Sequence, residues 1–239
     1  MYKNFSKVYD KFMEICDYNG WVNLLENYIS KYNPEGKNIL DLGCGTGETL
    51  VRLDNKYQCS GLDISEGMLK KAKIKLKGKN IPLFLGDMRE FDTYKKYDVI
   101  YSFFDTVNHL TSLEDLLDLF NSVKNSLNEN GVYIFDVVDR EFIEKMFAND
   151  IYADSRKDFA VIWEHFYDEE TKIDEIDASY FIKNKNNSYD RYNEFYEKRI
   201  FTHEEIEECA KRANLLLENF EKNEDLAGKR YFYILRSNK

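Results

Sequence analysis

The segment with the clearest chemical meaning is a glycine-rich stretch that follows a short apolar run. It reads Ile39-Leu40-Asp41-Leu42-Gly43-Cys44-Gly45-Thr46-Gly47. Closely spaced glycines let the backbone turn sharply and pass close to a ligand, and a helix that begins after them aims its free N–H groups at an anionic group. Asp63 ends the next apolar run, where a carboxylate can accept hydrogen bonds from both hydroxyls of a ribose. These residues predict a site for a cofactor that contains adenosine.

Two details distinguish between adenosine cofactors. The glycine spacing is GxGxG, since Glu48 follows Gly47, whereas dinucleotide-binding loops carry GxGxxG or GxGxxA. Asp41 stands just before the loop, and its carboxylate would repel the pyrophosphate of a dinucleotide. S-adenosyl-L-methionine has no phosphate and carries a sulfonium and an ammonium group, which acidic side chains attract. We therefore predict S-adenosyl-L-methionine as the cofactor, with Cys44 as a small loop residue and not a nucleophile.

Apolar runs and helical patterns alternate around this loop. Strands are expected at 38–42, 59–64, 82–86, 97–104 and 132–138. Ser65 can cap the helix after the second strand. Thr111 and Glu114 have capping-box spacing before a helix whose apolar face runs from Leu113 to Leu127. Strands that alternate with helices indicate a parallel sheet covered on both faces.

The flanking regions follow other patterns. Residues 1–36 are expected to form an N-terminal helical cap, with Trp21, Leu25 and Ile29 on one face. Residues 151–201 hold three β-like stretches, at 159–167, 173–182 and 189–201, joined by polar connections of hairpin length.

The end of the chain returns to the first pattern. A helix opens with the capping box of Thr202 and Glu205, and two strands follow at 215–220 and 229–236. We therefore predict an α/β, Rossmann-like, doubly wound fold with a mostly parallel seven-stranded sheet. Residues 37–150 and 202–239 would form the cofactor-binding domain, and 151–201 an antiparallel β insertion that roofs the acceptor pocket at the C-terminal side of the sheet.

The sequence resembles the class I S-adenosylmethionine-dependent methyltransferases over about residues 38–138. The resemblance rests on DLGCGTG (41–47), GLDIS (61–65), GDMREF (86–91), YDVIYSFFDTVNHL (97–110) and NENGVYIFDV (128–137). It implies that Asp41 and the backbone from Gly43 through Cys44 and Gly45 to Gly47 hold the methionine moiety, and that Asp63 binds the ribose. It further implies that Ile64 packs on the adenine, that Asp87 and the Met88 N–H bind the adenine edge, and that Ser102 and Phe103 line the methyl-transfer side.

A narrower resemblance extends to the ends of the chain. VYD (8–10), His109, the β insertion and Gly228-Lys229-Arg230 look like features of deoxyamino-sugar N,N-dimethyltransferases, and glycine- and sarcosine-type N-methyltransferases share part of this layout. His109 is the expected catalytic residue that orients the acceptor or takes its proton, unless it is a turn residue. Tyr9 would close over the cofactor carboxylate or pack in the core. Arg230 would meet a carboxylate of substrate or cofactor, or form a surface salt bridge.

The charge, hydropathy and cysteine content of the chain limit which partners and ligands are expected. The net charge is −10, from 34 basic and 44 acidic residues, and no basic stripe suits a nucleic acid. The Lys-rich helix over 70–79 fits a solvated face. No apolar run suggests a membrane span or a signal peptide, so a cytoplasmic protein is expected. The four cysteines show neither CxxC nor Cys/His clustering, and we predict no metal site.

The predicted function is methyl transfer from S-adenosyl-L-methionine to a small-molecule acceptor, with an amine favoured over an oxygen acceptor. Three alternatives remain open at this point. The first is a non-catalytic S-adenosylmethionine sensor or partner protein, the second is an O-methyltransferase, and the third is an NAD-dependent oxidoreductase, which Asp41 and the GxGxG spacing disfavour.

Overall fold

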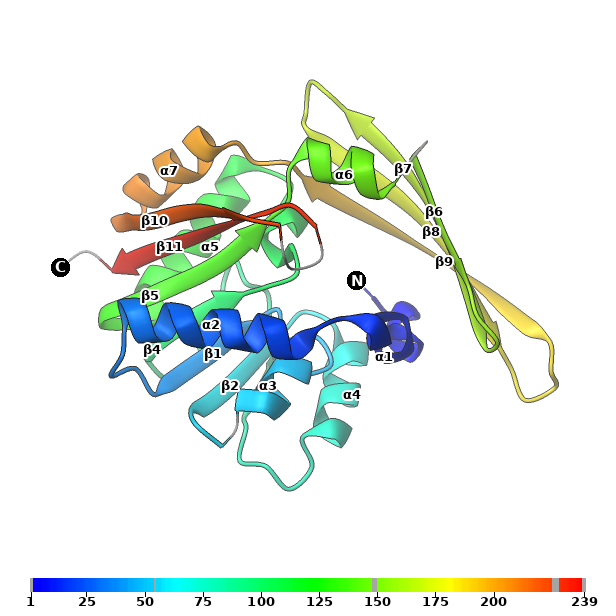
Figure 1. Cartoon of the computed structure of the whole chain (residues 1–239), viewed down its shortest axis with the longest axis horizontal. Coiled ribbons are helices and arrows are strands. Elements are labelled where there is room, and N and C mark those ends of the chain that lie inside the picture. The colour runs from blue at the N-terminus through cyan, green and yellow to red at the C-terminus, as the bar shows by residue number, and fades with distance from the viewer. Residues whose placement is uncertain (1, 54, 148–149, 225–227, 238–239) are drawn as a thin grey trace.

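The computed structural model describes residues 2–53, 55–147, 150–224 and 228–237. Its larger sheet has seven strands in the order β10-β11-β5-β4-β1-β2-β3 (Figure 1). The strands are β1 (Asn38–Leu42), β2 (Gln58–Asp63), β3 (Leu83–Leu85), β4 (Tyr97–Ser102), β5 (Leu127–Val137), β10 (Leu215–Asn223) and β11 (Arg230–Ser237). The strands from β5 to β3 pair in parallel, and β11 runs antiparallel to both β5 and β10. The predicted Rossmann-like, seven-stranded α/β fold is confirmed.

Helices cover both faces of this sheet (Figure 1). They are α2 (Tyr18–Tyr32), α3 (Glu48–Leu53), α4 (Glu66–Lys75), α5 (Leu113–Ser126) and α7 (His203–Arg212). Successive side chains of a strand point to opposite faces. Accordingly, Ile39 packs in the core with α2, α3 and α4, while Leu40 and Leu42 pack in the core with α5 and α7. Burial on both faces explains why the central strands read as continuous apolar runs.

The N-terminal region, predicted as a helical cap over residues 1–36, is largely helical in its described part and is divided into several short elements. It forms η1 (Phe5–Lys7), α1 (Tyr9–Phe12), η2 (Met13–Ile15) and, after a break, α2. Cys16 is extended with ψ 132°, and Asp17 caps α2 by accepting a hydrogen bond from the Gly20 N–H. The three short elements lack side-chain caps. We call residues 2–16 the N-terminal segment.

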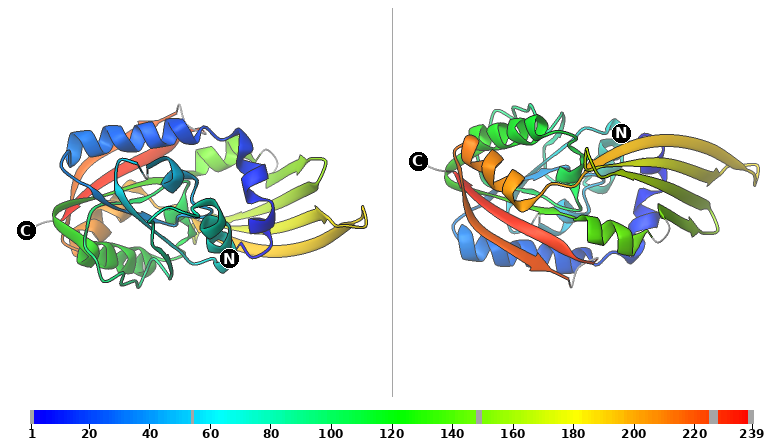
Figure 2. Two further views of the ribbon diagram at one scale, coloured as in Figure 1. Left: turned by 90° about the horizontal axis from the view of Figure 1, so that it is seen from below. Right: turned by 90° about the horizontal axis from the view of Figure 1, so that it is seen from above.

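A second, antiparallel sheet forms the insertion. It has four strands and not the three expected: β6 (Ile151–Ser155), β7 (Phe159–Asp168), β8 (Ile173–Lys183) and β9 (Tyr189–Arg199), paired in chain order. A short helix, α6 (Arg140–Met146), precedes it. The N-terminal segment crosses one face of this sheet (Figure 2), and a separate apolar cluster joins the two.

Helix and strand ends show which local signals were reliable. Ser65 caps α4, and Thr202 with Glu205 forms the predicted capping box of α7. The box predicted for Thr111 and Glu114 was wrong by one residue, because the Ser112 hydroxyl accepts from the Asp115 N–H at 3.0 Å. Leu127 begins β5 and does not extend the apolar face of α5.

No helix in the described part of the chain is both long and apolar enough to cross a bilayer.

Candidate active site

A cavity of about 220 Å³ lies at the carboxyl ends of β1, β2 and β4. In the sheet, β1 lies between β2 on one side and β4 on the other, so the strand order reverses at this point. Ligands of open α/β sheets usually bind at such a point. Its wall contains most of the predicted site residues, namely Tyr9, Asp41, Gly43, Cys44, Gly45, Asp63, Ile64, Asp87, Met88, Phe103 and His109. Within the described residues, Gly47, Ser102 and Arg230 lie outside this wall.

The glycine-rich loop is shaped by three glycines in the left-handed region. Gly43, Gly45 and Gly47 have φ values of 95°, 52° and 78°, which residues with a Cβ rarely adopt. A Cβ on Gly43 would lie 2.5 Å from the Thr106 Cγ2, whereas a Cβ on Gly45 would meet nothing within 4 Å. Since Gly45 lines the cavity, the open space at this position leaves room for a ligand against the backbone.

Asp63 connects this loop to the end of β2. Its Oδ2 accepts from the Gly45 N–H at 2.8 Å and its Oδ1 accepts from the Ser65 N–H at 2.7 Å. Burial raises the pKa of this carboxyl, and the two backbone N–H groups oppose that shift. A carboxylate has about four acceptor positions, so two remain for a further partner. Asp63 therefore fits the predicted contact with a ribose diol.

Asp41 is a buried carboxyl whose hydrogen-bond partners are neutral. Its Oδ2 accepts from the Thr49 hydroxyl at 2.6 Å and from the Tyr101 hydroxyl at 2.7 Å. Burial raises its pKa to about 7. A nearby cation would favour the ionised form of such a group. The cavity thus offers an acidic group to the positive end of a ligand, which fits the sulfonium and ammonium groups of S-adenosyl-L-methionine.

The expected adenine end of the cavity contains an additional cation. Arg89 donates to Asp87 from Nε at 3.1 Å and from NH2 at 2.7 Å, and these bonds hold the pKa of Asp87 below its ordinary value. NH1 of the same residue bonds to Asp115 at 2.7 Å. Arg89 and Asp115 also line the cavity and were missed, although Arg89 lies within GDMREF. Ile64 keeps an exposed fraction of 50% and offers an apolar surface to a flat ring.

The other end of the cavity is aromatic. Phe103 and Phe104 follow directly after β4, Tyr2 and Tyr9 belong to the N-terminal segment, and Tyr18 begins α2. Tyr2 and Tyr18 were not predicted, because an aromatic residue in a short helical stretch gives no signal of what it covers.

His109 ends the short helix η3 (Thr106–His109) at this aromatic end. Its Nε2 bonds to the Tyr2 hydroxyl at 2.7 Å, and the two rings meet edge to face. Burial, together with the charge of Lys198, lowers the pKa of His109 to about 3. The imidazole is therefore neutral at physiological pH, and Nε2 acts as a hydrogen-bond acceptor if Tyr2 donates.

Ser102 does not line the methyl-transfer side, contrary to expectation. It is fully buried, its hydroxyl donates to the Leu42 carbonyl at 2.8 Å, and it accepts from the Tyr133 hydroxyl at 3.0 Å. These bonds link β4 to β1 and β5. The neighbouring Phe103 is the residue that reaches the cavity.

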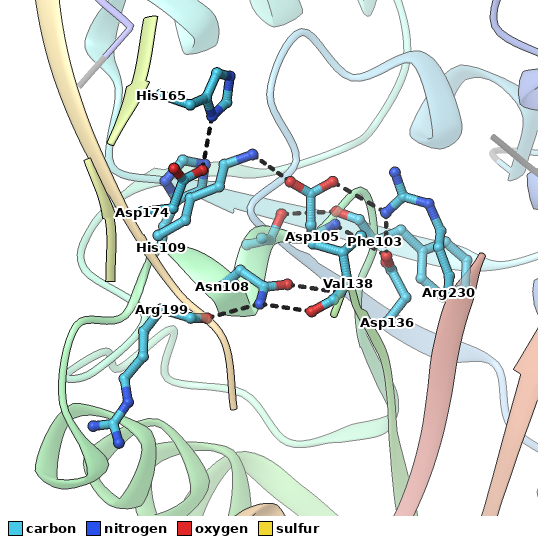
Figure 3. Close-up of polar contacts among 12 residues, drawn as sticks. Phe103, Asp105, Asn108, His109, Asp136, Val138, His165, Asp174, Arg199 and Arg230 are labelled. Atoms are coloured by element: carbon cyan, nitrogen blue, oxygen red, sulfur yellow. Dashed lines mark hydrogen bonds and ion pairs between the residues drawn. The ribbon is translucent and has the colours of Figure 1, made fainter. Parts of the chain in front are cut away.

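Arg230 forms neither a surface salt bridge nor a free carboxylate-binding group. Its NH1 donates to Asp105 at 3.0 Å and to Asp136 at 2.5 Å (Figure 3). The guanidinium lies 5.3 Å from the Trp21 ring centroid and 5.1 Å from that of Phe142. Its exposed fraction is 5% and that of Asp136 is 0%, so the pair of Arg230 and Asp136 lies in the protein interior.

Asp105 is the centre of this buried network and was not predicted. It follows Phe104, and the two have φ values of 52° and 63°, a strained conformation for residues with a side chain. The Asp105 N–H donates to Asp136 at 3.1 Å, and its carboxylate also accepts from the Lys198 Nζ of β9. The network therefore fixes the loop between Phe103 and His109 to β5, β9 and β11.

Comparison with known proteins agrees with this geometry. A family model described as a methyltransferase domain matches residues 39–131. YqeM of Bacillus subtilis, classed with the methyltransferases, is 34% identical over 220 residues, 91% of this chain and 87% of YqeM. The dTDP-3-amino-3,4,6-trideoxy-alpha-D-glucopyranose N,N-dimethyltransferase of Streptomyces venezuelae is 30% identical over 121 residues, half of each chain.

One solved structure matches along the whole chain. The crystal structure of an S-adenosylmethionine-dependent methyltransferase from Clostridium acetobutylicum superimposes with a TM-score of 0.85 at 25% identity, and the match covers 100% of this chain and 99% of that one. Together with the glycine-rich loop, Asp41 and Asp63 around one cavity, these matches show that the chain belongs to the class I S-adenosylmethionine-dependent methyltransferases.

Proposed function

We propose that this methyltransferase methylates the nitrogen of a small-molecule amine. The observation that carries the proposal is the neutral, weakly basic imidazole of His109 at the aromatic end of the cavity. A general base is most effective when its pKa lies near the working pH. An imidazole with a pKa of about 3 is a poor base for a hydroxyl acceptor. A neutral amine attacks through its own lone pair and needs no base before the attack.

The side chains at the aromatic end of the cavity are suited to positioning an acceptor. S-adenosyl-L-methionine supplies an activated methyl group on its sulfonium when it is bound. Because the Tyr2 hydroxyl occupies the single lone pair of the His109 Nε2, an acceptor N–H that donates to Nε2 would replace Tyr2 there. The lone pair of the acceptor nitrogen would then stay free and could be aimed in line. Phe103, Phe104 and Tyr9 would restrict the orientation of the acceptor and exclude water. His109 would then orient the acceptor without carrying its proton, one of the two roles expected from the sequence.

The Streptomyces venezuelae relative supports an amine acceptor, since its name states an N,N-dimethylation. The similarity covers half of each chain, so it bears on the type of acceptor atom and not on a particular sugar.

The test uses methyl-labelled S-adenosyl-L-methionine and a cell metabolite extract. We expect label in small, cationic, base-stable products, with a rate that rises with pH as the acceptor amine loses its proton. His109→Gln, which retains a hydrogen-bonding side chain, should keep most of the activity, and His109→Ala should lose about 10²-fold or less without losing cofactor binding.

Other results would point to other functions. Label that is released by mild alkali would indicate an ester product and an O-methyltransferase. Cofactor binding without any transfer would indicate a sensor. A rate that falls with the titration of a group in wild type, but not in His109→Gln, would show that His109 acts as a base.

A further inference from the structure

The chain makes a strained turn directly after β4. Phe104 and Asp105 have φ values of 63° and 52° in succession, and Asp105 is fully left-handed with ψ 27°. Glycine adopts this conformation without strain, and aspartate adopts it more readily than phenylalanine does. Residues with a side chain stay in it only where the surrounding structure holds them there. The contacts of these two residues therefore decide whether the turn persists.

The neighbours of Asp105 line the cavity, whereas Asp105 itself, within the described residues, does not. Phe104, Thr106 and His109 belong to the cavity wall. Thr106 also packs on the glycine-rich loop, since a Cβ on Gly43 would lie 2.5 Å from the Thr106 Cγ2. The turn thus connects the aromatic end of the cavity to the loop that is predicted to hold the methionine moiety, and its conformation sets how far apart the two lie.

Two cations hold the carboxylate of Asp105. NH1 of Arg230, on β11, donates to Oδ1 at 3.0 Å, and Nζ of Lys198, on β9, donates to Oδ2 at 2.5 Å (Figure 3). The Asp105 side chain keeps an exposed fraction of 13%, so water screens these contacts little. Burial alone would raise the pKa of the carboxyl, but the charges of Lys198 and Arg230 lower it to about 2. Asp105 is therefore ionised, with an ion-pair partner on each oxygen.

The insertion reaches this turn through Lys198. Within the described residues, no part of β6 to β9 lines the cavity, so the insertion sheet does not form the pocket roof expected from the sequence. Lys198 instead joins β9 to Asp105, as Arg230 joins β11 to the same carboxylate. Strands that are distant in the sequence thus hold the turn beside the aromatic end of the cavity.

We propose that Asp105 is a positioning residue for methyl transfer. Its carboxylate, bound to Arg230 and Lys198, holds the strained turn in place. The turn in turn sets Phe104 and His109 at the distance from the glycine-rich loop that in-line transfer needs. The rate depends steeply on this alignment, because a displacement of about 1 Å can cost about 10²-fold. The proposal concerns the alignment of donor and acceptor, and it holds for a nitrogen or an oxygen acceptor.

Three substitutions at Asp105 separate the conformation of the turn from its ion pairs. Asp105→Ala and Asp105→Gly both remove the carboxylate, but only glycine keeps the left-handed conformation without strain. We expect Asp105→Ala to lower the rate of label transfer from methyl-labelled S-adenosyl-L-methionine to a cell metabolite extract by about 10²-fold. The loss in Asp105→Gly should be at least about threefold smaller. Asp105→Asn should retain the most activity, because asparagine tolerates the left-handed conformation and can still accept a hydrogen bond.

Cofactor affinity is the reference for this comparison. Titration calorimetry with S-adenosylhomocysteine should give dissociation constants within about threefold of the wild-type value for all three variants, because an alignment defect acts on turnover and not on binding. Equal rates in Asp105→Ala and Asp105→Gly, or a loss of cofactor affinity as large as the loss of rate, would overturn the proposal. If Asp105→Ala does not fold, Lys198→Met removes one anchor and keeps every residue of the turn. Its rate should fall several-fold, and an unchanged rate would likewise overturn the proposal.

Trp21 reports the position of the turn without an acceptor. Its ring centroid lies 4.3 Å from that of Phe104, and its exposed fraction is 1%. The chain has two tryptophans, so Trp163→Phe leaves Trp21 as the single one. In that background, Asp105→Ala should shift the emission to longer wavelength and increase quenching by acrylamide, and Asp105→Gly should do so to a smaller extent.

Asp98→Ala is the matched control for the loss of a carboxylate. Asp98 lies at the other end of β4, where it accepts from the N–H groups of Lys37 and Asn38 at 2.9 Å each. The control should leave both the emission of Trp21 and the rate of label transfer unchanged. The same changes in Asp98→Ala as in Asp105→Ala, or an unchanged emission in Asp105→Ala, would contradict the positioning role.

Discussion

At the scale of single residues, Asp63 has a structural role in the glycine-rich loop in addition to the ligand-binding role predicted from the sequence. Its carboxylate accepts from the N–H groups of Gly45 and Ser65 and so shapes the glycine-rich loop, and we propose that its remaining acceptor positions bind a ribose. Asp63→Ala should lower the affinity for S-adenosyl-L-methionine by at least about 1.5 kcal/mol, the scale for hydrogen bonds to a charged group. Titration calorimetry measures this loss. Glu66→Ala, a change in an exposed pair with Lys70, is the matched control, and unchanged affinity in Asp63→Ala would remove Asp63 from the site.

The raised pKa of Asp41 predicts that cofactor binding depends on pH. Burial raises the pKa of its carboxyl to about 7, so the proton stabilises the cofactor-free protein at low pH and this contribution is lost as the pH rises through that value. A bound sulfonium and ammonium favour the carboxylate, so binding below the pKa must release a proton. Affinity should therefore increase from about pH 6 to about pH 8. Calorimetry in buffers of different ionisation enthalpy detects the released proton, and Asp41→Asn should abolish both the release and the pH dependence.

At the scale of elements, the start of α5 illustrates how a correct helix can have a wrongly placed cap. The Ser112 hydroxyl accepts from the Asp115 N–H at 3.0 Å, whereas Thr111 reaches only the Asp115 carboxylate, at 3.4 Å. Ser112→Ala should lower the free energy of unfolding by about 1 kcal/mol, and Thr111→Ala should change it by much less. Urea denaturation of the two variants compares them directly. A larger loss in Thr111→Ala would restore the original assignment of the cap.

The insertion shows the same limit for strands. β7 alternates more and less buried side chains along its length, and β8 does so over residues 173–178 and β9 over residues 191–196, which gives a period of two. β6 has five residues, three of them exposed, and pairs only with β7. An edge strand of this length carries little of the apolar alternation that identifies a strand.

At the scale of the whole molecule, Arg230 links parts of the chain that are distant in sequence. It joins β11 to Asp136 of β5 and to Asp105 of the loop after β4, and Lys198 extends the network to the insertion. Arg230→Met leaves the fully buried carboxylate of Asp136 without its ion-pair partner, so the free energy of unfolding should fall by about 3–5 kcal/mol. Denaturant unfolding measures the loss.

Two comparisons identify the origin of that loss. The added change Asp136→Asn should recover part of it, because one uncompensated charge is removed. Lys70→Met breaks an exposed pair with Glu66 and should cost at most about 1 kcal/mol. An equally small cost for Arg230→Met would mean that the buried network adds little to stability.

The sequence alone determined the fold class and the cofactor, and most of the site residues that it predicted line the cavity. These depend on local spacing: the GxGxG loop after a strand, an acidic residue at the end of the next strand, and the alternation of strands with helices. Each signal lies within a few tens of residues, and the shared carboxyl edge of parallel strands brings the marked positions together. The cofactor end of the site follows from that rule.

Only the tertiary structure decided what closes the other end. Tyr2 and His109 are 107 positions apart, and Arg230 is 125 positions from Asp105. The hydrophobic periodicity of the sequence carries no information about such pairs, because a contact between distant segments depends on how whole elements pack. The packing therefore places the N-terminal segment, and not the insertion, against the cavity, and it buries Ser102 and Arg230 beneath the site that they were expected to line.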